Sequence, residues 1–264
     1  MQPMLNIAIR AARKAGNTIS RAADRTYALK ITEKTANDFV TEVDRQAEQD
    51  IIQVIRKAYP SHAILAEETG QSGDNEYQWI IDPLDGTTNF LHGLPQFAVS
   101  IALQHKNVLE HAVIYNPLSD ELYTASRGSG AQLNDRRIRV NQRNSLQGAL
   151  LGTGIPFRDD QDLDFYLQTL KALIPGTAGI RRPGSAALDL AFVAAGRYDG
   201  FWEMGLQPWD MAAGILIVQE AGGIASDLSG QTPPLKTGNI VAGNIKIHAA
   251  MLQKLQAVQQ QNTL

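Results

Sequence analysis

The first apolar pattern along the chain has the spacing of an amphipathic helix. Leu5, Ala8, Ala12 and Ile19 recur at intervals of three, four and seven residues, which places them on one helical face. The repeat continues to Ala22 and predicts a first helix with one face against a core.

A second amphipathic helix is predicted after Thr41. Its apolar stripe includes Ile51, and Thr41 with Asp44 three residues later resembles a capping box in which Asp replaces the usual Glu. Pro60 disfavours helical geometry at Tyr59 and ends the helix there.

From His62 to about Val140 the pattern changes to short runs rich in β-branched and aromatic residues, separated by turn residues. The predicted strands are Ala63–Ala66, Gln78–Ile81, Phe97–Gln104, Val108–Tyr115 and Glu121–Ala125. Such closely spaced strands predict a largely antiparallel sheet.

After Gly148 strands and helices alternate. The predicted strands are Ala149–Thr153, Gly179–Arg182, Tyr198–Met204, one near Ile224 and Ile240–Ala242, and the predicted helices are Leu163–Leu173, Ala186–Ala195, Met211–Glu220 and one from about Ile245. Alternation of this kind predicts a second sheet covered by helices. We therefore predict an α+β layered sandwich, a single domain over 1–264 with two lobes, about 1–147 and about 148–264.

Composition sets limits on the function. Apolar residues make up 44% of the 264 positions and charged residues 19%, so the chain can fill a large core and is not disordered. With 24 basic and 27 acidic residues, the net charge of −3 gives no overall field that favours nucleic acid. The chain has no cysteine, which excludes disulfides, thiolate metal sites and cysteine nucleophiles.

The sequence carries no sign of a membrane segment. Arg10, Arg13 and Lys14 interrupt the early apolar stretch, which is therefore not a signal peptide. No window approaches the roughly 18 uncharged apolar residues of a membrane span. We expect a cytoplasmic protein with no membrane contact.

The segment 79–90 carries the most informative chemistry. An apolar strand leads directly into Asp82 and Asp85, and Pro83 keeps Asp82 extended. Gly86 permits a tight turn, and 87–89 suits a helix start, where free N–H groups bind anions. Two carboxylates beside a bound anion repel it unless a cation lies between them, and oxygen ligands favour Mg²⁺. The segment therefore suggests metal-assisted chemistry on a phosphate.

An ordinary turn after a strand explains the segment equally well when it is taken alone. Further acidic residues favour the metal site: Glu67 and Glu68 follow a short apolar strand, and Asp210 precedes an apolar helix. Asp38 and Asp44 lie on either side of a short apolar stretch. Singly, each of these has an ordinary explanation as a helix cap or a solvated surface residue, but together they favour the metal site.

Four segments, in this order, resemble the motifs of the inositol monophosphatase family: Asp38–Asp44, Ala66–Glu68, Trp79–Phe90 and Glu203–Gly223. The resemblance covers essentially the whole chain, and it departs from many members only in having Ala66 in place of a glycine. It implies the αβαβα sandwich of the inositol monophosphatase and fructose-1,6-bisphosphatase type. It also implies Mg²⁺-dependent hydrolysis of inositol 1-phosphate and related polyol phosphates by a metal-activated water.

The resemblance also implies a role for each matching residue. Glu67, Asp82 and the Leu84 carbonyl would hold one Mg²⁺, and Asp82, Asp85 and Asp210 a second; a third, weaker ion would lie near Glu67 through water. The second site, with three carboxylates, is where lithium would inhibit.

The attacking water would be oriented by Glu67 and by Thr87 paired with Asp44, and the backbone amides of Gly86 and Thr87 would bind the phosphate oxygens. The expected contacts to the inositol ring are Asp85, Ser185, Ala186, Glu203 and Arg181.

Two related activities remain alternatives, a 3′(2′),5′-bisphosphate nucleotidase and a fructose-1,6-bisphosphatase. The sequence 88–90 is similar to the inositol branch, since the nucleotidases more often carry a lysine and a glutamate there. Glu203 favours hydrogen bonding to a polyol.

A function of another class also follows from resemblance. The segments Gly184–Leu190 and Ala194–Arg197 are similar to a bacterial branch associated with antitermination of ribosomal RNA transcription, through NusA and RNA polymerase. The resemblance further implies a homodimer. A basic cluster formed by 136–139 with Arg143 is expected to be a solvated hairpin, with an RNA or protein contact as the alternative.

Overall fold

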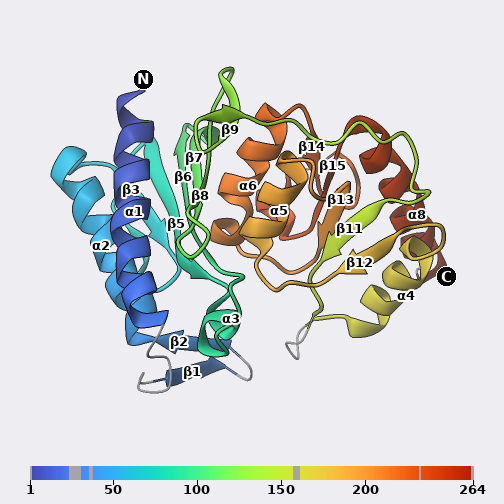
Figure 1. Ribbon diagram of the computed structural model, residues 1–264, viewed down its shortest axis with the longest axis horizontal. Coiled ribbons are helices and arrows are strands. Elements are labelled where there is room, and N and C mark those ends of the chain that lie inside the picture. The colour runs from blue at the N-terminus through green and yellow to red at the C-terminus, as the bar shows by residue number, and fades with distance from the viewer. Residues whose placement is uncertain (1, 24–30, 36–37, 157–160, 232, 263–264) are drawn as a thin grey trace.

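The computed structural model describes residues 2–23, 31–35, 38–156, 161–231 and 233–262. In this part of the chain the elements form five layers, in which two helices, a sheet, two helices, a second sheet and two helices follow one another (Figure 1). The predicted α+β fold, a layered αβαβα sandwich, is confirmed.

The first layer consists of α1 (Pro3–Ala23) and α2 (Glu42–Ala58). Small buried side chains such as Ala8 and Ala12 line the inner face of α1, and the apolar faces of both helices pack on the first sheet. The predicted capping box begins α2: the Thr41 N–H donates to Asp44 Oδ2 over 2.8 Å, and Thr41 Oγ1 accepts from the Asp44 N–H.

The first sheet has eight strands within the described residues, in the order β10-β9-β8-β7-β6-β5-β3-β4. They are β3 (Ala63–Ala66), β4 (Gly70–Ser72), β5 (Tyr77–Asp85), β6 (Ala98–His105), β7 (Val108–Asn116), β8 (Glu121–Ser126), β9 (Gly130–Leu133) and β10 (Arg136–Arg137). All neighbours are antiparallel except β3 and β5. The predicted antiparallel arrangement is therefore largely confirmed.

The middle layer is formed by α5 (Ala186–Ala194), buried at every residue but Phe192, and α6 (Pro208–Glu220), buried from Met211 to Val218. Helical segments with apolar side chains on almost every face must be covered on all sides. These helices lie between the two sheets, and their side chains share one core with residues of both.

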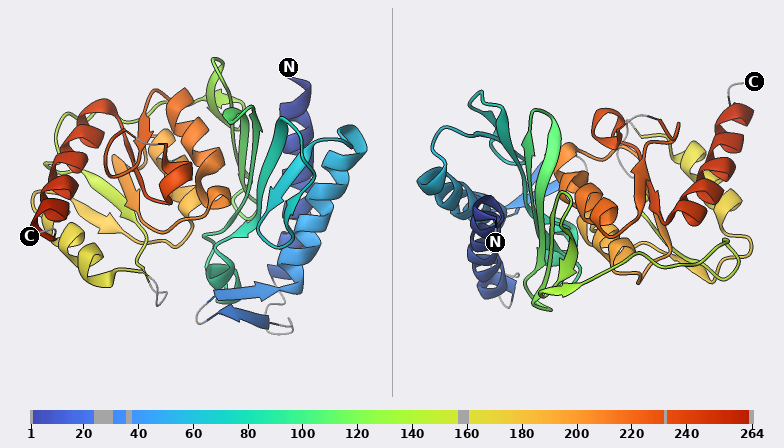
Figure 2. Two further views of the ribbon diagram at one scale, coloured as in Figure 1. Left: turned by 180° about the vertical axis from the view of Figure 1, so that it is seen from behind. Right: turned by 90° about the horizontal axis from the view of Figure 1, so that it is seen from above.

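The second sheet has the order β12-β11-β13-β15-β14 among the described residues. Its strands are β11 (Leu150–Thr153), β12 (Gly179–Arg181), β13 (Gly200–Glu203), β14 (Ile224–Ser226) and β15 (Ile240–Gly243). The outer helices α4 (Leu163–Leu173) and α8 (Ile245–Asn262) pack on each other and on this sheet. Two further views place them at the opposite end of the molecule from α1 and α2 (Figure 2).

The structure contains elements that the sequence pattern did not predict. The hairpin of β1 (Ile31–Thr35) and β2 (Asp38–Thr41) precedes α2, and α7 (Pro234–Thr237) is a further short helix. The helix start predicted at 87–89 is confirmed as α3 (Thr87–Leu91). No helix in the described residues has the length and apolarity to cross a membrane. The division into two lobes of one domain stays a prediction.

Candidate active site

The end of β5 places two carboxylates at the edge of the first sheet. The pairing of β5 with β6 shifts register between Asp82 and Asp85, and Asp82, which is only 2% exposed, accepts a hydrogen bond from the Leu84 N–H over 2.9 Å. Gly86 follows with φ +95°, and a Cβ there would lie 2.7 Å from the Gln96 carbonyl oxygen. The turn into α3 therefore requires glycine.

A cleft of about 690 Å³ opens at this edge, between the end of β5 and the starts of α5 and α6. Most of the predicted site residues line it, namely Glu67, Asp82, Leu84, Asp85, Gly86, Thr87, Ser185, Ala186, Glu203 and Asp210. The fold thus brings together four segments that are far apart in sequence.

Asp44 and Thr87 form a pair beside the cleft. Thr87 Oγ1 lies 2.8 Å from Asp44 Oδ1, to which it donates, and 3.1 Å from the Leu84 carbonyl oxygen. Asp44 is 1% exposed, and burial raises its pKa, while the hydrogen bonds from Thr41 and Thr87 lower it. The carboxylate therefore fixes the threonine hydroxyl at the cleft wall.

Asp85 connects the two sides of the cleft. Its Oδ2 accepts hydrogen bonds from the Ser185 hydroxyl over 2.6 Å and from the Ala187 N–H over 2.7 Å, both at the start of α5. Burial raises the pKa of Asp85 to about 6, although these hydrogen bonds act in the opposite direction. Asn89 makes a second connection, because its amide donates to the carbonyl oxygens of Pro183 and Gly184 over 2.8 and 3.2 Å.

Burial and, after it, like charges raise the pKa values of Asp82 and Asp210 in the cleft. Burial, and then the neighbouring carboxylates of Glu67, Asp85 and Asp210, raise the pKa of Asp82 well above its usual range. Asp210 has a raised pKa for the same reasons, with Asp85 as its strongest repelling neighbour. Asp85 and Asp210 are half-buried, and both line the cleft.

The chemistry of these donors fits a hard cation, since carboxylate and carbonyl oxygens are the ligands that Mg²⁺ prefers. Among the described residues, however, no three His, Cys, Asp or Glu side chains are grouped closely enough to hold a metal. Protein donors engage the carboxylates instead: Asp210 Oδ2, for example, accepts from the Gln207 N–H over 2.7 Å. A cation would have to draw them together.

The structure also shows what the sequence pattern missed. Arg182 lines the cleft, whereas the expected Arg181 is absent from the described lining and is exposed. Gly154 also lines it, and a Cβ at this position would lie 1.8 Å from Glu203 Oε1. Asp189 is a further lining residue. It belongs to the segment Gly184–Leu190 that resembles a family branch, but nothing in the pattern indicated that its side chain lies at the cleft.

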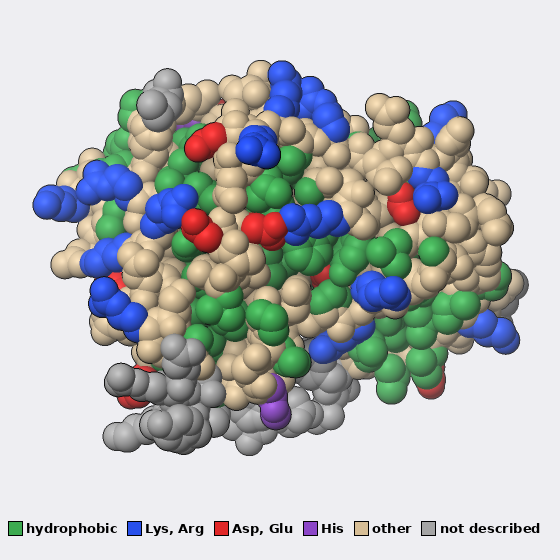
Figure 3. All heavy atoms as spheres, in the orientation of Figure 1, with side chains coloured by type: hydrophobic (Ala, Val, Ile, Leu, Met, Phe, Trp, Pro, Cys, Tyr) green, Lys and Arg blue, Asp and Glu red, His purple; other side chains and the backbone are tan. Residues whose placement is uncertain are grey.

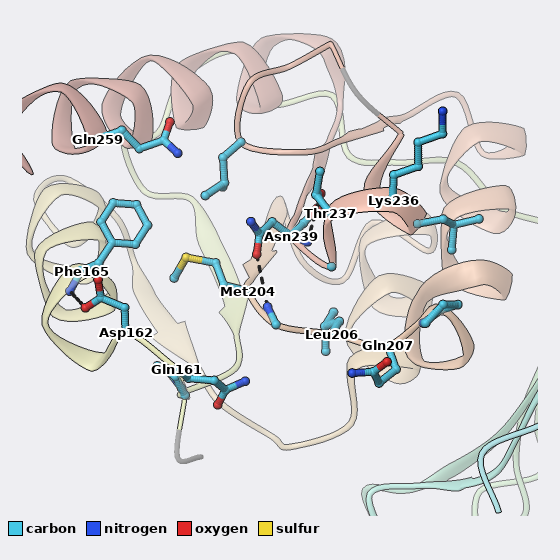
Figure 4. Close-up of a pocket in the computed structure, with 16 residues that line it drawn as sticks. Gln161, Asp162, Phe165, Met204, Leu206, Gln207, Lys236, Thr237, Asn239 and Gln259 are labelled. Atoms are coloured by element: carbon cyan, nitrogen blue, oxygen red, sulfur yellow. Dashed lines mark hydrogen bonds between the residues drawn. The ribbon is translucent and has the colours of Figure 1, made fainter. Parts of the chain in front are cut away.

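The cleft continues into a second cavity of about 570 Å³, shown in Figure 4. Gln161, Met204 and Leu206 border both. Gly205 lies between Met204 and Leu206 in the chain, and its N–H donates to the Asn239 side-chain oxygen over 3.2 Å. This hydrogen bond fixes the backbone where the two cavities meet.

The basic cluster lies away from this cleft. Arg136 and Arg137 are exposed in β10, and Arg143 forms an ion pair with Asp199, with 3.3 Å between Nε and Oδ2. On the face shown in Figure 3, Lys and Arg side chains are dispersed among other side chains. Arg136 and Arg137 thus lie on the β9–β10 hairpin, whereas Arg143 lies outside it and pairs with a buried carboxylate; a contact of this cluster with RNA or protein stays an open alternative.

Comparison with known proteins agrees with the geometry. The family model described as the inositol monophosphatase family matches residues 1–261. The chain belongs to this family. The resemblance in the sequence motifs is therefore confirmed.

Individual relatives of this inositol monophosphatase family member carry two kinds of name. A protein named Nus factor SuhB from Pseudomonas aeruginosa is 60% identical over 262 residues, with 97% of each chain covered. The crystal structure of the extragenic suppressor protein SuhB from Bartonella henselae superposes with a TM-score of 0.94 at 46% identity, covering 97% of this chain and 99% of that one. An inositol monophosphatase from Anabaena superposes with a TM-score of 0.83 at 38% identity, covering 96% and 95%.

Proposed function

We propose that the chain is a Mg²⁺-dependent phosphomonoesterase that hydrolyses inositol 1-phosphate and related polyol phosphates. The observation that carries the proposal is the meeting of Glu67, Asp82, Asp85 and Asp210 in one cleft, next to a threonine hydroxyl fixed by Asp44. Glu67 and Asp85 both raise the pKa values of Asp82 and Asp210, and such crowding of acids in a cleft favours a site that binds cations.

These oxygens would bind two Mg²⁺ ions and a third, weaker one. Glu67, Asp82 and the Leu84 carbonyl would hold the first, and Asp82, Asp85 and Asp210 the second, with the third near Glu67 through water. When bound, such ions lower the pKa of water and stabilise charge on the leaving oxygen.

The protein's own groups would orient the reactants. Because the Thr87 hydroxyl donates its proton to Asp44, its oxygen is left as an acceptor for the attacking water, with Glu67 as a second acceptor. The N–H groups of Gly86 and Thr87 at the start of α3 would donate to the phosphate oxygens and stabilise their charge.

The opposite wall would bind the alcohol part of the ester. Glu203 ends β13 beside Gly154, whose missing side chain makes room for the carboxylate. Ser185 and Ala186 lie at the start of α5 and would contact the alcohol. Arg181, next to the lining residue Arg182, would be a further contact. Carboxylates suit hydroxyl groups better than they suit a second phosphate, which favours a polyol over a bisphosphate.

A substrate panel with Mg²⁺ tests this activity. Inositol 1-phosphate, adenosine 3′,5′-bisphosphate and fructose 1,6-bisphosphate are compared by kcat/KM from phosphate release. The highest value is expected for inositol 1-phosphate. A higher value for the adenosine compound would identify the nucleotidase, and one for the fructose compound the bisphosphatase.

A second role is supported by the relatives named Nus factor. We propose that the surface outside the cleft also contacts the transcription antitermination machinery, through NusA or RNA polymerase. In a pull-down with purified NusA and RNA polymerase, the wild-type chain and Asp82→Asn should be retained equally. If neither protein is retained, this second role is contradicted, and the proposed phosphatase activity is unaffected.

Further properties follow as part of the proposal. The protein would be a cytoplasmic homodimer, and lithium would inhibit it at the second metal site. Sedimentation that gives only the 28.8 kDa species would contradict the dimer, and inhibition that is competitive with substrate would contradict the lithium site.

A further inference from the structure

One acid in the cleft takes no part in the proposed chemistry. Asp189 lies on α5, is 1% exposed and lines the cleft. Its Oδ1 has no hydrogen-bond partner among the described residues. The other eight side chains of α5 are all apolar and pack in the core. Asp189 is therefore the single acid of this helix.

Such a group is costly in a folded protein. A buried polar atom without a partner loses its hydration and gains nothing in return. Asp189 is also surrounded by like charges: after burial, Glu203 and Asp85 raise its pKa, and Arg182 lowers it. A leucine of similar shape would satisfy the helix better, so the acid has no evident value for the fold alone.

Asp199 provides the contrast. It too is buried and has one unpartnered oxygen, but its other oxygen accepts from the Leu150 N–H over 2.8 Å and faces Arg143. These contacts connect β11 to the segment before β13, and they account for Asp199 structurally. No side-chain hydrogen bond or ion pair of this kind holds Asp189 within the described residues.

We infer that Asp189 is a specificity-determining residue that hydrogen-bonds a hydroxyl group of the substrate alcohol deep in the cleft, on the side of Glu203. A carboxyl group can accept from a hydroxyl and, when protonated, donate to one. A site that carries such a buried group disfavours an analogue lacking the hydroxyl, because the acid is then left unpaired. This inference rests on the proposed phosphatase function.

A matched pair of esters tests it. Inositol 1-phosphate and cyclohexyl phosphate share a six-membered ring and a phosphate, but the second has no hydroxyl group. For Asp189→Leu, we expect the ratio of kcat/KM between the two esters to fall by about tenfold, mainly through KM. Asp189→Asn, which keeps a donor and an acceptor, should restore most of the ratio.

Stability gives an independent readout. The melting temperature of Asp189→Leu should equal or exceed that of the wild type, since an unpartnered buried acid is removed. The control Asp199→Asn should lower the melting temperature and leave the substrate ratio unchanged.

Each other result contradicts the inference. An unchanged ratio in Asp189→Leu, or equal losses on both esters, would mean that Asp189 does not contact the alcohol. A lower melting temperature with an unchanged ratio would assign it a structural role, such as holding a buried water. A wild type that hydrolyses neither ester would instead refute the proposed function itself.

Discussion

The two walls of the cleft are built in different ways. On one wall, Asp82, Asp85 and Thr87 come from a single short stretch at the end of β5, and protein donors or acceptors hold each of them. On the other, Glu203 and Asp189 come from separate elements, and Asp189 has an unpartnered oxygen. The first wall carries groups suited to binding a phosphate and a cation. Hydrolysis of every phosphate ester would use these groups.

This difference suggests that the two walls have different roles in catalysis and in substrate preference. Substitutions on the β5 wall should lower turnover of all esters alike, whereas substitutions on the α5 and β13 wall should change the preference among them. Asp85 lies between the two classes, because it belongs to the first wall and accepts hydrogen bonds from the second.

The largest effect is expected from Asp82→Asn. The amide keeps the shape but removes the charge at the centre of the carboxylate group, so kcat should fall by roughly 10³-fold on every ester. The fold should remain intact, because the Asn side-chain oxygen can accept the same hydrogen bond from the Leu84 N–H and the repulsion from neighbouring carboxylates is relieved. Near-normal turnover at saturating Mg²⁺ would refute the metal-binding role of this wall.

Thr87→Val should lower kcat by about 10²-fold with little change in KM, since it removes the hydroxyl that orients water. The partner variant Asp44→Asn should act through the same hydrogen bond. A double-mutant cycle measures this: the double variant should be hardly slower than Thr87→Val. Strictly multiplicative losses would mean that the two residues act independently.

Gly154→Ala should affect the opposite wall. Its Cβ would collide with Glu203 Oε1 and move the carboxylate, so KM for inositol 1-phosphate should rise by about tenfold. Cyclohexyl phosphate should be hydrolysed as before. Equal losses on both esters would show that this wall also serves the phosphate chemistry.

The smallest expected effect is the contribution of Asp85 to the pH dependence of folding stability, measured on the metal-free protein in chelator. The folded pKa of Asp85 is about 6, above its ordinary 3.8. The folded state therefore keeps a proton that the unfolded chain loses first, and stability from this group is present at low pH and is lost as pH rises through 6.

The difference between the melting temperatures of the wild type and Asp85→Asn reports this group together with its effect on Asp82 and Asp210, whose pKa values it raises. Relative to the variant, the wild type should lose stability between about pH 4 and pH 6. Three buried histidines, His62, His111 and His248, have lowered pKa values and oppose this trend in both proteins. A difference that is constant with pH would contradict the raised pKa.

The sequence allowed the β5 wall to be predicted almost completely. Its residues are contiguous, so local rules for proline, glycine and helix starts place Asp82, Asp85 and Gly86 without knowledge of the rest of the fold. The capping box of Thr41 and Asp44 was equally local, and the structure confirms it.

The other wall could not be predicted in the same way. The choice between Arg181 and Arg182 depends on how the chain leaves β12, and Asp189 follows no spacing that marks a site. The β1–β2 hairpin was missed because its first strand is largely polar. The start of α6 was placed at Met211, three residues late, because the pattern of apolar residues does not register Pro208, which suits a first helical turn.

A Mg²⁺ titration of phosphate release from inositol 1-phosphate tests the central proposal most directly. Activity should be absent in chelator, rise with Mg²⁺ to saturation in the wild type, and stay near the chelator level in Asp82→Asn at every concentration. Phosphate release that does not depend on Mg²⁺, or an Asp82→Asn variant that follows the wild-type curve, would contradict the assignment of this cleft as a metal-dependent phosphatase site.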